Sequence, residues 1–448
     1  MREKLLSRRS SPPSVCRRGK PVCCGWKVSG WTWVPTLYFA EGLPYVAVMT
    51  MAVILYKRLG LGNAEIALYT SWLYLPWTVK PLWSPFVDLL RTKRWWVISM
   101  QGLLAVALAG VAFFIPTVFA VKASLACFWL MAFASATHDI AADGYYLLCL
   151  TPGEQSLFIG IRNTFYRLAN IFGQGLLVML AGWLEQTRGS TALAWSLTFY
   201  AMAGLFLALT IYHRFILPHP SDDGPRRTRS FRSILRSFGA TFTSYFLQDK
   251  APLLLFFLLT YRLGEAQLAK LTSPFLLDGP LQGGLGLSTS TVGVVYGTVG
   301  VVALLLGGIL GGWLVSVHGF RRWILPMALA INLPDLLYVW LASALPAQAW
   351  VVALCVAVEQ FGYGFGFTAY TLCLILMADG PYKTAHYALG TGIMAIGMML
   401  PGMFAGMIQE ATGYPVFFLW VFLCTLPGLV ATLLVRRTLD PGFGRHSR

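Results

Sequence analysis

The chain has 448 residues, of which 57% are hydrophobic and only 12% are charged. This small number of charged side chains cannot cover the surface of a water-soluble protein of this length. The composition therefore excludes a soluble enzyme and predicts a membrane protein with many spans. The net charge of +16 alone would suit a nucleic-acid-binding protein. The basic residues follow a membrane topology better, however, and we expect no nucleic-acid partner.

Residues 1–31 form a basic tail with no apolar core of the kind found in a secretory signal peptide, and we interpret it as cytoplasmic. Twelve apolar segments follow, each long enough to cross a bilayer as a helix of about 20 residues. They lie at residues 32–54, 64–88, 95–115, 121–149, 158–183, 192–217, 251–277, 289–317, 323–343, 349–377, 384–408 and 414–436.

A polar and basic linker at residues 218–241 separates the first six segments from the last six. The sequence therefore predicts an all-α membrane protein with two six-helix bundles, at residues 32–217 and 242–437, and a second cytoplasmic tail at residues 438–448.

The distribution of Lys and Arg orients these spans. With both termini in the cytoplasm, most basic residues lie in the tails and the inner loops, as the positive-inside rule requires. The exceptions on the outer side are Lys57, Arg58, Lys122, Arg188 and Lys270, and those within or at the edges of spans are Lys80, Arg167 and Arg262.

The two halves resemble each other. Ala-Gly-Trp-Leu-Glu-Gln-Thr-Arg-Gly at residues 181–189 resembles Ala-Gly-Met-Ile-Gln-Glu-Ala-Thr-Gly at residues 405–413, and residues 84–94 resemble residues 312–322 at nearly the same separation. Two such pairs indicate an internal duplication. Repeated six-helix halves, with a binding site between them near the bilayer midplane, are typical of the major facilitator arrangement.

The second repeated segment carries a predicted gating motif of a small residue, an acid and a basic cluster. Its members are Asp88, Arg91, Lys93 and Arg94 in the first half, and Ser316, Arg321 and Arg322 in the second. An acid at a helix end can pair with basic groups or with a helix N-terminus and so hold the halves in one state. Because Ser316 replaces the acid, we expect the second latch to be weaker. Alternatively, the basic residues serve only to set the topology.

Several segments resemble one branch of this superfamily: Tyr38-Phe-Ala-Glu-Gly-Leu-Pro-Tyr45, Lys80-Pro-Leu-Trp-Ser-Pro-Phe-Val-Asp88, Ala134-Ser-Ala-Thr-His-Asp-Ile-Ala-Ala-Asp143 and Leu259-Thr-Tyr-Arg-Leu-Gly-Glu265. Together they are similar to the AmpG-like permeases, the peptide/acetyl-coenzyme A transporter branch of the major facilitator superfamily. The resemblance covers most of residues 33–436. It implies proton-driven import of muropeptides, GlcNAc–anhydroMurNAc with or without peptide, across the bacterial inner membrane for peptidoglycan recycling.

Ionisable residues stand inside the predicted spans, where each costs about 2.5–3.5 kcal/mol on insertion scales and usually faces a cavity or a partner. Residues 133–145 contain His138, Asp139 and Asp143, and the two aspartates share a helix face. In the superfamily that the chain resembles, helices 1, 4, 7 and 10 line the cavity, and each of them carries an acid here. The predicted proton-coupling residues are Asp139, Asp143, Glu41, Glu265 and Glu359. The alternative is a hydrogen-bonded structural network that never titrates.

The predicted substrate-binding residues are Arg262, Lys80, His138, Tyr261, Gln360 and Tyr363. Arg262 either binds an anionic group, such as a lactyl carboxylate, or forms a structural ion pair with Glu265. Lys80 either pairs with one of the two aspartates or extends to the membrane interface. The alternating aromatic and glycine residues at 361–367 suit either sugar stacking or close helix packing.

For further polar residues, the sequence allows two roles each. Arg162 and Arg167 could meet a phosphate or a carboxylate, or merely face the cytoplasm. Asn332 and Asp335 bracket Pro334 in the ninth span, and we expect them to serve packing or gating.

The leading hypothesis is a proton-coupled symporter with alternating access and a small-molecule substrate. It acts as a monomer in the lipid bilayer. A permease for another anionic solute, of the siderophore or acetyl-coenzyme A type, is the alternative, and a membrane-embedded transferase is the least favoured. The sequence contains no Gly-x4-Gly-Lys-Ser/Thr phosphate loop and no metalloprotease motif, so we expect neither an ATPase nor a cofactor or metal site.

Overall fold

A computed structural model describes residues 29–220, 223, 239, 242–378 and 383–444 of the chain. Most of the predicted tail at residues 1–31 and of the predicted linker at residues 218–241 lies outside these residues. Every regular element that is described is helical, as predicted.

The elements of the N-terminal half are α1 (Gly30–Val46), η1 (Ala47–Met51), α2 (Ala52–Arg58), α3 (Asn63–Trp72), α4 (Leu75–Leu90), α5 (Lys93–Phe114), α6 (Ala120–Cys149), α7 (Pro152–Asn170), η2 (Ile171–Leu177), α8 (Val178–Arg188) and α9 (Thr191–Ile216). Those of the C-terminal half are α11 (Ala251–Thr260), α12 (Leu263–Leu277), η3 (Pro280–Gln282), α13 (Thr289–Val292), η4 (Gly293–Gly300), α14 (Val301–His318), α15 (Phe320–Asn332), α16 (Asp335–Ala344), α17 (Ala349–Met377), α18 (Lys383–Thr412), α19 (Tyr414–Leu423) and α20 (Leu426–Thr438).

Four of the twelve predicted spans are broken helices: the second, the seventh, the ninth (α15 and α16) and the twelfth (α19 and α20). Among the described residues, ten helices are long and apolar enough to cross a membrane by themselves. The second predicted span is divided into α3 and α4 just before Pro76, and the seventh into α11 and α12 at Tyr261 and Arg262. A broken helix at membrane depth is tolerated where its freed backbone groups face protein or a water-filled cavity. The breaks in the second and seventh spans therefore mark the inner surfaces of the bundle.

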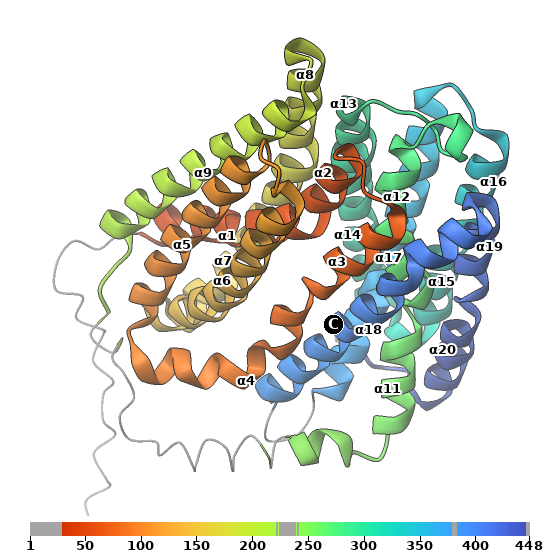
Figure 1. The fold of residues 1–448 in the computed structure, drawn as a ribbon. Coiled ribbons are helices and arrows are strands. Elements are labelled where there is room, and N and C mark those ends of the chain that lie inside the picture. Colours follow the sequence, from red (N-terminus) through yellow and green to blue (C-terminus); the bar gives the residue numbers. More distant parts are fainter. Residues whose placement is uncertain (1–28, 221–222, 224–238, 240–241, 379–382, 445–448) are drawn as a thin grey trace, which may run out of the picture.

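Figure 1 shows the two halves side by side, with the N-terminal half in red to yellow-green and the C-terminal half in green to blue. α8 and α13 approach each other at the top of this view. We call this end of the bundle the closed end. The opposite end, where α9 ends and α11 begins, we call the linker end.

The predicted repeat at residues 181–189 and 405–413 is also a repeat in structure. The first copy ends α8 and the second ends α18. Each copy stops at a glycine with positive φ, +66° at Gly189 and +77° at Gly413. Glycine has no Cβ, so it adopts this left-handed conformation without strain and ends a helix there. Both glycines lie at the closed end.

Glycines of α17 allow close packing on both sides of that helix. A Cβ atom at Gly364 would lie 1.9 Å from the carbonyl oxygen of Leu304 in α14, and one at Gly362 would lie 1.9 Å from that of Ala330 in α15. The aromatic and glycine pattern of residues 361–367 thus serves helix packing, which was one of its two predicted roles.

Replacing Gly364 by Ala is therefore expected to destabilise the protein. The added methyl group would meet a backbone atom that cannot rotate away, and overpacking of this kind costs about 1–3 kcal/mol. Thermal unfolding of the purified protein should show a Tm several degrees lower. Gly312→Ala on α14 is the matched control, because a Cβ there meets no atom within 4 Å; its Tm should be unchanged or slightly higher.

Candidate functional site

Five charged residues of the N-terminal half come together from four helices. We call them the N-terminal cluster, and they are Glu41 on α1, Lys80 on α4, Asp139 and Asp143 on α6, and Arg162 on α7.

Asp139 forms an ion pair with Lys80, whose Nζ donates to Oδ2. This pairing was one of the two predicted positions of the lysine. The side chains are only partly buried, with 25% of Lys80 and 18% of Asp139 exposed. The pair is therefore packed in the bundle but remains accessible.

Asp143 is held by two partners. Arg162 Nη1 lies 3.1 Å from Asp143 Oδ1, and the hydroxyl of Tyr38 donates to the same oxygen at 2.9 Å. The guanidinium group of Arg162 also stacks over the rings of Tyr38 and Tyr146, at 4.5 and 5.3 Å from their centroids. Arg162 thus meets a carboxylate of the chain itself, and its contact with an anionic solute stays a prediction. The Asp143 side chain is 45% exposed, although it belongs to a helix of the bundle interior.

Glu41 completes the N-terminal cluster. Asp139 and Asp143 are its charged neighbours, and its buried Oε2 has no hydrogen-bond partner among the described residues. Three carboxyls thus share two cations, Lys80 and Arg162. Two carboxylates in contact repel each other unless a proton neutralises one of them. The N-terminal cluster therefore has room for one more positive charge.

His138 does not join this cluster, although it was predicted as a substrate-binding residue. It is 1% exposed, and its Nε2 lies 3.0 Å from Nε2 of Gln101 on α5. Gln101 Oε1 in turn accepts from Nδ1 of His213 on α9 at 2.9 Å. His138 is thus part of a polar chain that joins helices within the N-terminal half, and it packs as a satisfied core histidine.

The C-terminal half contains a second group of buried charges. We call Arg262, Glu265, Asp335 and Glu359 the C-terminal cluster. All four are at most 7% exposed. A Cβ at Gly264 would lie 3.5 Å from Asp335 Oδ2, which places this carboxylate against the start of α12 beside Glu265.

Arg262 faces aromatic side chains rather than an acid. Its Nη2 donates to the hydroxyl of Tyr363 at 2.6 Å, and its guanidinium lies 5.2 Å from the ring centroid of Tyr363 and 5.1 Å from that of Phe367. No ion pair with Glu265 is found in the described chain, so the predicted structural salt bridge is wrong. Nε of Arg262 and Oε2 of Glu265 are both buried without a partner among the residues described.

The other predicted residues of α17 and α11 hold structural contacts. Glu359 accepts from the Tyr338 hydroxyl at 3.2 Å and from Gln360 Nε2 at 3.0 Å. Tyr261 is fully buried and donates to the carbonyl of Gly366 at 2.9 Å. Tyr261, which lies between α11 and α12, therefore packs within the half, with its ring centroid 6.0 Å from that of Tyr370.

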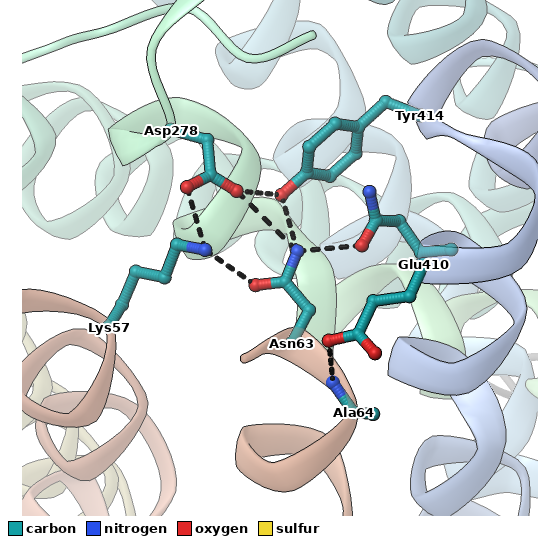
Figure 2. A network of polar contacts seen from close by, with 7 residues as sticks. Lys57, Asn63, Ala64, Asp278, Glu410 and Tyr414 are labelled. Carbon is teal, nitrogen blue, oxygen red and sulfur yellow. Dashed lines mark hydrogen bonds and ion pairs between the residues drawn. The ribbon is translucent and has the colours of Figure 1, made fainter. Parts of the chain in front are cut away.

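A polar network that the sequence did not predict joins the two halves at the closed end (Figure 2). Lys57 Nζ lies 2.6 Å from Asp278 Oδ1 and donates to Asn63 Oδ1 at 2.8 Å. Asn63 Nδ2 donates to Gln409 Oε1 at 2.7 Å and to the Tyr414 hydroxyl at 2.9 Å. Tyr414 itself donates to Asp278 Oδ2 at 2.6 Å. We call these five residues the closed-end network.

Two further contacts close the same end. Glu185 on α8 accepts from Arg58 Nε at 3.1 Å and from the Thr289 hydroxyl at 2.7 Å, so it links both halves. α8 and α13 also touch directly, because a Cβ at Gly182 would lie only 2.3 Å from the backbone nitrogen of Ser290. The hydrogen bonds and ion pairs between described residues of the two halves all lie on this side of the bundle.

Lys270 differs from its predicted place on the outer surface. It is 3% exposed and lies in α12, where its Nζ donates to Thr70 Oγ1 at 3.1 Å and sits 5.0 Å from the ring centroid of Tyr74. It lies near the outer end in sequence, but α3 and α18 cover it.

Among the described side chains of the predicted gating motif, the printed contacts of Arg91, Arg94 and Ser316 stay within their own half. The side chain of Asp88 lies outside the described residues. Arg94 donates to the carbonyls of Leu217 and Arg214, and Arg91 stacks over Trp95. The motif's other described contacts are local: Lys93 packs against Gly144, Ser316 donates to the carbonyl of Trp313, and Arg321 and Arg322 are exposed.

Comparisons with known proteins agree with this architecture. Residues 36–406 match the family model of the Major Facilitator Superfamily. The anhydromuropeptide permease of Escherichia coli K12 is 28% identical over 418 residues, which cover 90% of this chain and 79% of that protein. A protein named putative transporter AmpG 4 from Rickettsia conorii is 25% identical over 411 residues, or 88% of this chain and 93% of its own length.

Solved structures show the same fold. A D-xylose–proton symporter superposes with a TM-score of 0.70 at 11% identity and covers 93% of this chain and 99% of its own. The nucleoside transporter NupG superposes with a TM-score of 0.64 at 14% identity and covers 91% and 99%. The helical bundle, the duplicated halves and the matching family model lead to one conclusion: the chain is a multi-pass membrane transporter that belongs to the Major Facilitator Superfamily.

Proposed function

We propose that this protein is a proton-coupled symporter that imports muropeptides, such as GlcNAc–anhydroMurNAc, by alternating access. It acts as a monomer in the bacterial inner membrane, with both termini in the cytoplasm. The observation that carries this proposal is the N-terminal cluster, in which three carboxyls share two cations at a position that solvent reaches.

The N-terminal cluster supports proton coupling through its charge balance. Lys80 neutralises Asp139 and Arg162 neutralises Asp143, which leaves Glu41 without a cation. A proton shared by Glu41 and Asp139 removes the repulsion between them. When this proton binds or leaves, the charge of the carboxyls around Lys80 changes, and so do the contacts of Lys80. A conformational change between the halves can follow.

Arg262 supports an anionic substrate. Among the charged residues of the C-terminal cluster it is the sole cation, and one of its N–H groups lacks a partner among the described residues. The Tyr363 and Phe367 rings beside it offer apolar faces of the kind that stack on sugars. Since the similar E. coli protein is named an anhydromuropeptide permease, an N-acetylated sugar with a carboxylate is the substrate class that we propose.

The closed-end network supports alternating access. With both termini cytoplasmic, the closed end faces the periplasm, and the described conformation is closed on that side. Asp143 near the opposite end of α6 is exposed, in keeping with access from the cytoplasm. Import requires the closed-end network to break once in each cycle.

Uptake of radiolabelled GlcNAc–anhydroMurNAc into energised membrane vesicles of known orientation that contain the protein tests this proposal. Right-side-out vesicles should accumulate the solute, and a protonophore should collapse the accumulation. Uptake that competes with a siderophore or with acetyl-coenzyme A instead would identify a different anionic solute. Absence of muropeptide uptake at every pH would contradict the substrate assignment.

A further inference from the structure

A basic pocket lies at the linker end of the N-terminal half, and its lining shares no residue with either charged cluster. It has a volume of about 260 Å³ and is lined by the start of α5, the end of α9 and the residues that follow α9. Its lining includes Arg94, Trp95, Arg214, His219 and Asp223. No step of the proposed transport cycle uses these residues.

The walls of the pocket are fixed by hydrogen bonds. Arg94 Nε donates to the carbonyl of Leu217 at 3.1 Å, and its Nη2 donates to the carbonyl of Arg214. Asp223 accepts from the backbone N–H groups of Lys93 at 2.6 Å and of Arg94 at 3.0 Å. α5 and α9 are thus tied together around the pocket, which does not depend on a ligand for its shape.

The charges of the pocket favour an anion. Both oxygens of Asp223, the one acid in its lining, already accept N–H groups at the start of α5. Arg94 keeps N–H groups beyond the two that it uses, and the exposed Arg214 side chain has no partner among the described residues. Partial burial and the neighbouring Arg94 guanidinium lower the pKa of His219, as expected in an electropositive site.

The surroundings of the pocket are those of a membrane surface. Leu207, Ile211 and Phe215 are 54%, 52% and 82% exposed, and their spacing places them on one face of α9 that leads to the pocket. Trp95 in the pocket wall is 44% exposed. Tryptophan is enriched where a membrane protein meets the lipid headgroups, and an exposed apolar face on a spanning helix contacts acyl chains.

We propose that this pocket binds the headgroup of an anionic phospholipid. The phosphate lies between Arg94, Arg214 and His219, and an acyl chain follows the apolar face of α9. Basic pockets between membrane helices bind anionic lipid headgroups in this way. Such a lipid would join the ends of α5 and α9 and stabilise the N-terminal half.

Thermal unfolding of the delipidated full-length protein in detergent tests the proposal. Phosphatidylglycerol should raise the Tm by at least about 3 °C more than phosphatidylcholine at the same concentration, because a ligand that binds only the folded state stabilises it. The double variant Arg214→Gln/His219→Gln should lose this difference. Both side chains are exposed, so the variant should fold, and Arg94 with its structural hydrogen bonds stays in place.

Arg436→Gln is the matched control. Arg436 is an exposed basic residue in the last turn of α20, which holds in the C-terminal half the place that α9 holds in the N-terminal half. It should keep the full response to phosphatidylglycerol. An equal response of the double variant and this control would overturn the proposal. Stabilisation by inorganic phosphate alone, with no further effect of the lipid, would also overturn it and would identify a phosphate site.

Discussion

Replacing Asp139 by Asn is expected to abolish solute accumulation while solute exchange continues. Asp139 is the carboxyl that pairs with Lys80 and is also a charged neighbour of Glu41. When residue 139 is a neutral Asn, Glu41 no longer lies beside a second acid. The proton that the two carboxyls share is then neither bound nor released during transport. With a gradient of about one pH unit, a one-proton symporter accumulates its solute about tenfold. We expect this ratio to fall to about one in the variant.

Two measurements on proteoliposomes separate these activities. Gradient-driven uptake should fail in Asp139→Asn, whereas counterflow of labelled against unlabelled solute should persist. Because the substitution leaves Lys80 without its carboxylate, the neutral pair Lys80→Met/Asp139→Asn serves as a second variant that removes the uncompensated charge. Glu154→Gln is the control, since Glu154 only caps the exposed start of α7. Wild-type accumulation in Asp139→Asn would show that Asp139 does not carry the coupling.

Replacing Asp278 by Asn is expected to open the closed end. The substitution leaves Lys57, whose side chain is only 14% exposed, without its counter-ion in the closed-end network, and breaking a buried ion pair costs about 3–5 kcal/mol. Only the conformation with this end closed bears that cost. The equilibrium should therefore shift by at least about a hundredfold toward the conformation in which the closed end is open.

Spin labels at positions 188 and 281 measure this change, because both residues are exposed at the closed end and belong to different halves. Asp278→Asn should add a population with a longer distance between the labels. Lys57→Met/Asp278→Asn should shift the distances less, since it leaves no unpaired charge. Lys122→Met, an exposed lysine at the start of α6, should leave them unchanged. If the distance distribution between the labels in Asp278→Asn is identical to that in the protein with native Asp278, the closed-end network is excluded as a gate.

The fold could be predicted because it rests on composition and length. Apolar segments of spanning length, basic inner loops and two repeated motifs are all visible in the chain itself. The breaks within four of the spans are less visible in the sequence. Pro76 marks the one between α3 and α4, whereas the break at Tyr261 and Arg262 has no proline and depends on the packing around a buried guanidinium.

The N-terminal cluster could be predicted in part. The spacing of Asp139 and Asp143 placed them on one face of α6, and an acid on α1 suggested a neighbour. Pairing of Lys80 with one of the two aspartates was one of its two predicted positions, and the structure shows that the partner is Asp139. The partner of Arg162 could not be predicted, since the contact of α7 with α6 and α1 is a property of the tertiary structure.

The closed-end network was missed because its residues resemble ordinary helix ends. Lys57, Asn63 and Asp278 stand beside glycines at the borders of spans, where polar residues usually face water. Asp335 was assigned to packing or gating because helix 9 is peripheral in this fold. An acid directly after Pro334 at a helix break was the available signal, and the structure places it beside α12.

Proton movement driven by the solute alone is the decisive measurement of proton coupling in this protein. Proteoliposomes that enclose a pH-sensitive dye, with no imposed gradient, would receive GlcNAc–anhydroMurNAc from outside. The interior should acidify as the solute enters, and it should not acidify in Asp139→Asn or after addition of an unrelated sugar. Entry of the solute at the same rate with no change of internal pH would contradict proton coupling.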